Sequence, residues 1–144
     1  MVLPLLLAGA IGCGSSTPSA PAISIVSTAG GAVIDITGLN RGDRAALRSA
    51  GLSEDEWAQV FTVAVDNASA ARQPPMAGRY VVDAEVRFVP AFPLDPGRRY
   101  AVTFDPSRLP RTAASRIPAA QATVSLPAVA HVPSTVVTAV YPSG

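Results

Sequence analysis

The chain has 144 residues, which is enough for one domain with a substantial core. A net charge of +1 creates no field that would gather nucleic acid or anionic lipid, so we expect no nucleic-acid partner. The single cysteine excludes an internal disulfide, and fourteen prolines and eleven glycines favour short strands joined by turns over a helical fold.

The amino-terminal segment is apolar over residues 1–12 and is followed by Cys13. It is too short to span a bilayer, which takes about 20 residues, and it fits a secretory signal peptide. Small residues before Cys13 and a polar stretch after it make the segment similar to a bacterial lipobox. The resemblance implies cleavage before Cys13, a lipid on its thiol, and a membrane-anchored lipoprotein exported to the bacterial cell envelope. A plain secretory signal, or an apolar start with an incidental cysteine, remains the alternative.

The segment after Cys13 has the composition of a flexible tether. Residues 14–22 read GSSTPSAPA, which buries too little surface to fold. We therefore expect a flexible linker over residues 13–29 and a folded domain over residues 30–127.

Strands are expected over most of this domain, because apolar and polar residues alternate in short runs. Turn signals from proline, glycine and aspartate separate the runs, and this spacing favours an antiparallel β-sandwich. The expected strands are 30–39, 61–67, two within 78–90, 98–104 and 121–127. The apolar faces predict a core of Ile34, Ile36, Phe61, Val63, Tyr80, Val82, Val86, Phe88, Tyr100, Val102 and Phe104.

Two short helices are expected between the first two of these strands. In the first, Asn40 can cap the opening amides and Gly51 can close the end. In the second, Ser53 and Glu56 form a capping box, and Trp57 lies on the face that would dock onto the core. Both helices are short, so their stability must come from that docking.

The stretch VRFVPAFPLDPGRRYAVTF, residues 86–104, has the composition of two strands joined by a tight turn. Pro96 presets the second position of the turn and Gly97 accepts a positive φ at the third, as a type II turn requires. Leu94 and Phe92 are expected to fold under the loop and close the end of the core. Every residue has a structural explanation, so the stretch needs no ligand.

One pattern in this stretch resembles the penultimate hairpin of bacterial immunoglobulin-like domains: Phe88-x-Pro90-x-x-Pro93-Leu94-x-Pro96-Gly97-x-x-Tyr100-x-Val102. The similarity covers about residues 78–126. Such domains are modules of exported and cell-surface proteins, with mainly structural and adhesive roles. The resemblance implies a mainly β fold, an antiparallel immunoglobulin-like β-sandwich with a small two-helix insert near 40–60, and no active site.

No catalytic, cofactor or metal site is expected. His131 is the only histidine and lies between prolines with no acid near it in sequence, which favours a linker position over a Ser/His/Asp site. Cysteines and histidines do not occur in pairs at zinc-ligand spacing. Aspartates at strand ends could gather at one pole as calcium ligands, although solvated strand ends are the simpler interpretation. They are Asp35, Asp66, Asp83, Asp95 and Asp105.

Three further motifs have local explanations. Arg41-Gly42-Asp43 spells an integrin tripeptide, but its place beside Asn40 predicts helix capping. Asn67-Ala68-Ser69 is a glycosylation sequon only in a host that uses it. A mildly basic side lacks the interleaved aromatic residues of nucleic-acid sites. It comprises Arg98, Arg99, Arg108, Arg111 and Arg116.

The expected function is that of a lipid-anchored or exported structural or interaction module of the cell envelope, and not of an enzyme. Its partners would be the membrane, through the lipid on Cys13, and other envelope proteins or polysaccharide. The alternatives are a non-catalytic fragment of a larger exported enzyme and a carbohydrate-binding surface protein. Residues 128–144 are expected to form a linker and the start of a further strand or domain.

Overall fold

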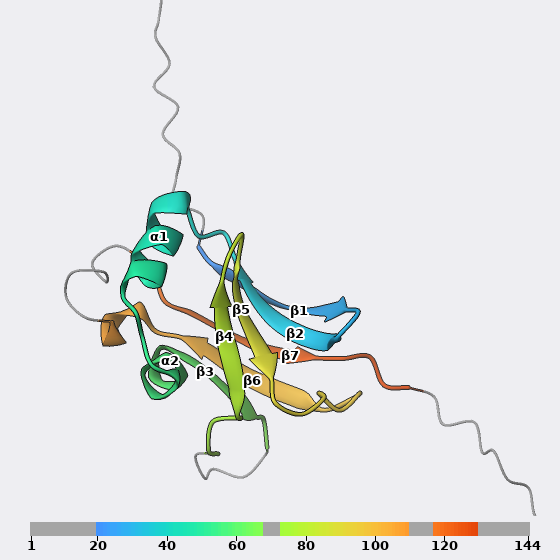
Figure 1. Cartoon of the computed structure of the whole chain (residues 1–144). Coiled ribbons are helices and arrows are strands. Elements are labelled where there is room, and N and C mark those ends of the chain that lie inside the picture. The colour runs from blue at the N-terminus through green and yellow to red at the C-terminus, as the bar shows by residue number, and fades with distance from the viewer. Residues whose placement is uncertain (1–19, 68–72, 110–116, 130–144) are drawn as a thin grey trace, which may run out of the picture.

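The computed structural model describes residues 20–67, 73–109 and 117–129. They form two antiparallel sheets, one of four strands and one of three, with two short α-helices (Figure 1). The mainly β architecture predicted from the alternating runs is confirmed. In chain order the elements are β1 (Ala22–Thr28), β2 (Gly31–Thr37), α1 (Arg41–Ser49), α2 (Glu54–Val60), β3 (Phe61–Val65), β4 (Gly78–Val82), β5 (Val86–Pro90), β6 (Arg99–Phe104), the 3-10 helix η1 (Pro106–Arg108) and β7 (Ala120–Ser125).

The strand order is β1-β2-β5-β4 in the larger sheet and β3-β6-β7 in the smaller one. All paired neighbours are antiparallel. The chain therefore changes sheet after β2, returns at β4 and changes again after β5. The apolar sides of the two sheets face each other, which gives a sandwich-like arrangement.

The core lies between the sheets. All of the predicted core residues except Tyr80 and Val82 are buried, and these two are partly buried and pack against the rest. Aromatic rings form its centre, with the ring of Phe61 6.1 Å from that of Phe88 and 6.4 Å from that of Phe104. Burying a side chain of this size contributes roughly 1.5–3 kcal/mol, so the core is the main source of stability.

The two expected helices are present, with the caps that the sequence indicates. Asn40 Oδ1 accepts the N–H of Asp43 at 2.8 Å, and Gly51 follows α1 with a φ of +59°. This left-handed conformation is the one that favours glycine after a helix end. Ser53 and Glu56 form the reciprocal capping box of α2.

Both helices dock onto the core through one apolar face, as their short length requires. Leu47 of α1 and Val60 of α2 are buried. The ring of Trp57 stacks on that of Tyr80, with centroids 5.4 Å apart and planes 14° from parallel. The Tyr80 hydroxyl in turn donates to the carbonyl oxygen of Phe61 at 2.9 Å, which joins α2, β4 and β3.

The predicted turn after β5 is confirmed. The N–H of Arg98 donates to the carbonyl oxygen of Asp95 at 3.3 Å, and Gly97 has a φ of +77°. The N–H of Gly97 also donates to the carbonyl oxygen of Leu126 at 2.9 Å. The turn therefore holds the chain that follows β7.

The expectation that Phe92 closes the end of the core is wrong, because its side chain is 74% exposed. Leu94 is buried as expected. The space beneath the loop is occupied by Leu94 and by the hydroxyl of Tyr100, which accepts the N–H of Asp95 at 2.7 Å. Phe92 is thereby left on the outside of the loop.

The flexible linker expected over residues 13–29 is wrong from Ala22 onward, because residues 22–28 form β1. β1 pairs with β2 along its whole length, from Ala22 opposite Thr37 to Thr28 opposite Gly31. Its two isoleucines, Ile23 and Ile25, pack against the core. Serine and alanine in this segment obscure a real alternation, so composition alone is misleading here.

The strands lead the chain from one pole of the sandwich to the other (Figure 1). Ala22 pairs with Thr37, so β1 begins at the pole where β2 leads into α1. β5 starts at this same pole, with Val86 opposite Ile36, and runs to the turn at the far pole. That turn holds Leu126, so β7 ends at the pole opposite to the start of β1.

Candidate functional site

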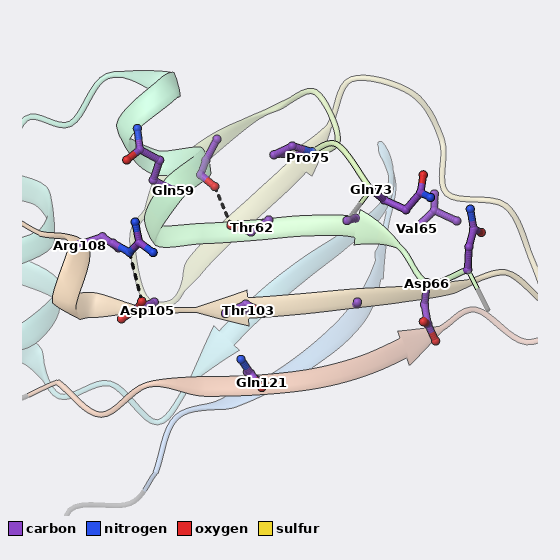
Figure 2. Close-up of a pocket in the computed structure, with 14 residues that line it drawn as sticks. Gln59, Thr62, Val65, Asp66, Gln73, Pro75, Thr103, Asp105, Arg108 and Gln121 are labelled. Carbon is purple, nitrogen blue, oxygen red and sulfur yellow. Dashed lines mark hydrogen bonds and ion pairs between the residues drawn. The ribbon is translucent and has the colours of Figure 1, made fainter. Parts of the chain in front are cut away.

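The outward face of the three-stranded sheet carries a groove of about 540 Å³ (Figure 2). Its floor follows from strand alternation. Alternate residues of β3 and β6, among them Phe61 and Val102, are buried in the core, so the residues between them face outward. These outward side chains are small or polar. They are Thr62, Ala64, Ala101 and Thr103, joined by Gln121 of β7.

The polar residues of the floor form one row across the sheet. Thr62 pairs with Thr103, and Thr103 pairs with Gln121. Neighbouring strands are about 4.8 Å apart, so the row offers three polar groups at that spacing. Ala64 and Ala101 pair in the next row. The floor thus presents a polar row beside an apolar one.

The groove is bounded along β3 by α2 and by the segment that precedes β4. Thr62 Oγ1 donates to the carbonyl oxygen of Ala58 at 2.7 Å, which keeps the last turn of α2 and Gln59 beside the floor. The N–H of Met76 donates to the carbonyl oxygen of Val63 at 2.7 Å, which aligns the preceding residues with β3. The lining residues of that segment are Gln73 and Pro75.

Charged residues lie at both ends of the groove, and each carboxylate has a guanidinium partner. Arg108 Nε lies 3.5 Å from a carboxylate oxygen of Asp105, and Arg99 Nε lies 3.3 Å from one of Asp66. The hydrogen bond from the Ser107 hydroxyl holds the pKa of Asp105 below its ordinary value, so this carboxylate is ionised at neutral pH. The groove therefore presents paired charges and not a field of one sign.

The uncharged polar side chains of the lining retain hydrogen-bonding capacity. Among the residues that the structure describes, no hydrogen bond uses the side chain of Gln59, Gln73, Thr103 or Gln121. Each of these groups can both donate and accept. The arrangement is suited to binding a polar, uncharged group.

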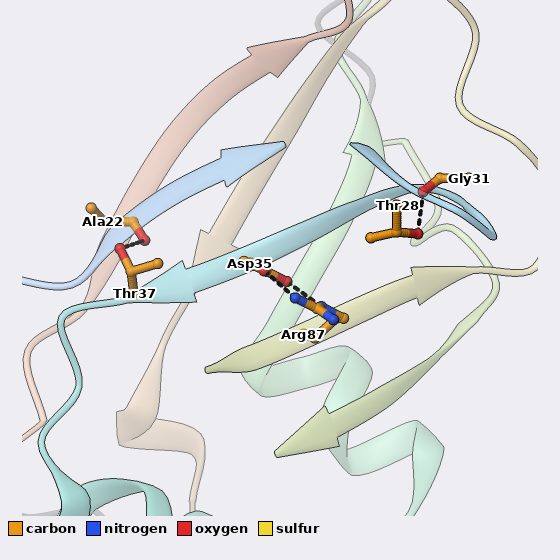
Figure 3. Close-up of polar contacts among 6 residues, drawn as sticks. All are labelled: Ala22, Thr28, Gly31, Asp35, Thr37 and Arg87. Atoms are coloured by element: carbon orange, nitrogen blue, oxygen red, sulfur yellow. Dashed lines mark hydrogen bonds and ion pairs between the residues drawn. The ribbon is translucent and has the colours of Figure 1, made fainter. Parts of the chain in front are cut away.

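The aspartates considered as calcium ligands do not gather at one site. Asp35 lies on the outward face of the other sheet, where Arg87 binds both of its oxygens, at 2.7 and 2.6 Å (Figure 3). Asp95 is paired with Arg98 at 2.8 Å, and the pairs of Asp66 and Asp105 are given above. In the described part of the chain, no group of three or more metal-ligating side chains occurs.

Two local interpretations from the sequence are confirmed. The Arg41-Gly42-Asp43 tripeptide begins α1, and Asp43 contributes its N–H to the cap on Asn40. Trp57 is only 8% exposed and packs on Tyr80. Its ring is therefore part of the core and offers no stacking platform to a ligand.

Several residues singled out from the sequence lie outside the described residues. They are Cys13, Ala68, Ser69, Arg111, Arg116, His131 and the strand expected near the carboxyl terminus. Within the described ranges, no helix has the length and apolar character needed to cross a membrane.

Sequence reasoning missed the groove. Its floor is made of threonine and alanine at alternating positions of β3 and β6, as in any strand with one buried face. The available signal was weak: the four outward positions of β3 and β6 that form the floor hold only threonine and alanine. Comparisons with models of known protein families, with curated proteins and with solved structures give no match.

Proposed function

We propose that the chain is a lipid-anchored, exported module of the bacterial cell envelope that acts as a structural or interaction domain without catalysis. Its fold would be immunoglobulin-like, and its anchor would be a lipid on Cys13. The observation that carries the proposal is the position of β1, which begins at Ala22, nine positions after Cys13.

The strand order supports an immunoglobulin-like topology. In constant-type immunoglobulin domains the strands, lettered in chain order, form the sheets ABED and CFG. The same lettering of β1 to β7 gives A-B-E-D for the four-stranded sheet and C-F-G for the three-stranded one. The helices α1 and α2 would then be an insertion between strands B and C.

The contact of Tyr100 with the loop before β6 supports the same topology. Immunoglobulin domains carry a tyrosine near the start of strand F whose hydroxyl bonds to the backbone a few residues upstream. Tyr100 is the second residue of β6, and its hydroxyl accepts the N–H of Asp95 at 2.7 Å. Tyr100 is also one of the residues in the pattern that resembles this family, and the hydrogen bond gives that position of the pattern a structural role.

The distance between Cys13 and β1 supports a domain held near a membrane. Residues 14–21 can span at most about 29 Å when fully extended. Since β1 begins at the pole of α1, that pole would face the membrane. β7 ends at the opposite pole, so Leu126 would lie on the side of the domain away from the bilayer. Such an orientation would suit a spacer or display module.

The intact mass of the native protein, purified from the membrane fraction, tests the anchor. We expect a chain that starts at Cys13 and carries the added mass of a lipid. The Cys13→Ser variant should lack that added mass, whereas Ser15→Ala, two positions away, should keep it. A processed chain of unmodified mass in the soluble fraction would refute the lipid anchor and favour plain secretion.

A further inference from the structure

We infer that the groove on the outward face of β3, β6 and β7 binds a neutral oligosaccharide through its amide and hydroxyl side chains. The inference names a ligand class for the interaction module proposed above and rests on that function. It does not depend on the lipid anchor, so the two can fail separately.

The size and shape of the groove fit a short oligosaccharide. Its volume of about 540 Å³ lies within the range of about 300–1,000 Å³ that is usual for small-molecule sites. The groove runs along the strands, from Asp105 and Arg108 at one end to Asp66 at the other (Figure 2). An elongated ligand could follow β3 and β6 between these ends.

The charges of the lining favour an uncharged ligand. Asp105 is paired with Arg108, and Asp66 with Arg99. The positive and negative charges of each pair largely cancel, so the lining offers little net attraction to an anion or a cation. A neutral ligand leaves both pairs intact.

The polar groups of the lining match sugar hydroxyls, each of which donates one hydrogen bond and accepts others. Gln59, Gln73 and Gln121 supply amides with both functions, and Thr103 supplies a hydroxyl. The hydroxyl hydrogen of Thr62 is used for the carbonyl oxygen of Ala58 at 2.7 Å. The two lone pairs of the hydroxyl oxygen remain able to accept from a ligand. The row across the sheet therefore offers a directional set of contacts to a polyhydroxyl compound.

The apolar part of the floor is small, which favours a sugar over a protein partner. Ala64 and Ala101 offer methyl groups to the C–H face of a sugar ring. Protein interfaces are enriched in clusters of tryptophan, tyrosine and arginine, and among the residues that the structure describes no aromatic side chain lines the groove. A peptide strand that adds to a sheet needs a free edge, whereas this surface is a sheet face.

The affinity is expected to be low, since it depends on a few hydrogen bonds and no aromatic stacking. A Kd on the order of 1 mM follows from about four such contacts. The test is an NMR titration of the full isotope-labelled chain with four neutral hexasaccharides, cellohexaose, maltohexaose, mannohexaose and hexa-N-acetylchitohexaose, each to about 10 mM. A detergent without a sugar headgroup is required, because a glycoside headgroup would compete.

We expect at least one hexasaccharide to shift the side-chain amide signals of Gln59, Gln73 and Gln121. The double variant Thr103→Val with Gln121→Leu should weaken binding at least about tenfold, as the loss of two hydrogen bonds requires. Thr123→Val is the matched control. Thr123 lies on the same face of β7 as Gln121 and pairs with Ala101, but it does not line the groove. Its effect should stay within about twofold.

Three results would overturn the inference. One is the absence of shifts at these glutamines with all four hexasaccharides. The second is binding that the double variant leaves unchanged while both variants keep the parental NMR spectrum elsewhere. The third is tighter binding of an acidic oligomer, such as hexagalacturonate, than of any neutral one.

Discussion

The hydroxyl oxygen of Tyr100 accepts the backbone N–H of Asp95 at 2.7 Å, while the ring of the same residue is 2% exposed between the sheets. One side chain therefore fills the core and fixes the loop between β5 and β6. The two roles can be separated by substitution, because phenylalanine keeps the ring and removes the hydroxyl.

We expect Tyr100→Phe to lower the free energy of unfolding by about 1–3 kcal/mol, since it leaves the Asp95 N–H without its partner. Tyr100→Ala should cost about 3–5 kcal/mol, because it also leaves a cavity. Urea denaturation followed by Trp57 fluorescence measures both. Phe92→Ala is the control, with an effect of about 0.5 kcal/mol or less at an exposed position. A loss below about 1 kcal/mol for Tyr100→Ala would place the ring outside the core.

Gly78 is the position at which the sheet tolerates no side chain. A Cβ there would lie 2.4 Å from the ring of Phe88 and 2.6 Å from the carbonyl oxygen of Val89. We expect Gly78→Ala to cost about 1–3 kcal/mol, because Phe88 is buried and has no free space to move into. Thermal unfolding measures the loss of stability. Gly30→Ala is the control, because a Cβ at Gly30 has only one neighbouring atom within 4 Å, at 4.0 Å. Equal stability of the two variants would contradict the packing described for Phe88.

In the Asp35–Arg87 ion pair the carboxylate is buried and the guanidinium is partly exposed to water. Asp35 is nearly inaccessible, with 5% of its side chain exposed, against 39% for Arg87. We expect Arg87→Met to cost about 3 kcal/mol, the low end for such pairs, because water reaches the guanidinium. The double variant Asp35→Leu with Arg87→Met should recover most of that loss. A double-mutant cycle measures the coupling, and additive effects would show that the pair contributes nothing.

Tyr80 makes the fold sensitive to alkaline pH. Burial raises the pKa of Tyr80 to about 12, and the negative charge of Glu54 adds to the shift, whereas an unfolded tyrosine titrates near pH 10. Between these values the unfolded state loses its proton and the folded state does not. The contribution to stability is therefore complete below about pH 10 and is lost as the pH rises through about 12.

The measurement is the free energy of unfolding from about pH 9 to about pH 12, for the parent chain and for Tyr80→Phe. As the pH rises across this interval, the parent chain should lose more free energy of unfolding than Tyr80→Phe does. Phenolate absorbance of the folded chain gives an independent titration. A constant difference over the whole interval would argue against a raised pKa.

Much of the sandwich could be predicted from the sequence, because its signals are local. β2 to β7 follow from alternation, α2 from the Ser53–Glu56 capping box, and the turn after β5 from Pro96 and Gly97. β1 could not, since its serines continue the serine- and alanine-rich stretch before it and resemble a linker until its seven pairs with β2 are known. The prediction that Phe92 is buried was wrong for a similar reason. Whether an aromatic side chain in a loop is buried depends on which residues already fill the space beneath the loop.

The groove could not be predicted, because no single strand contains it. Thr62, Thr103 and Gln121 belong to three strands that are far apart in the sequence, and only the register brings them into one row. The pairing of aspartates with arginines was equally hidden. Asp35 and Arg87 are 52 positions apart and meet as cross-strand neighbours of β2 and β5.

The placement of the start of β1 and the end of β7 at opposite poles determines how the domain would respond to mechanical force. Tension between a membrane tether and a structure beyond β7 would pull β1 lengthwise along β2. All seven residue pairs of that ladder would resist together in shear, instead of opening one after another as in a zipper. Force spectroscopy with attachment at residues 20 and 129 measures that resistance directly. Residues 22–28 would then be the strand that resists mechanical unfolding, although their sequence resembles a flexible linker.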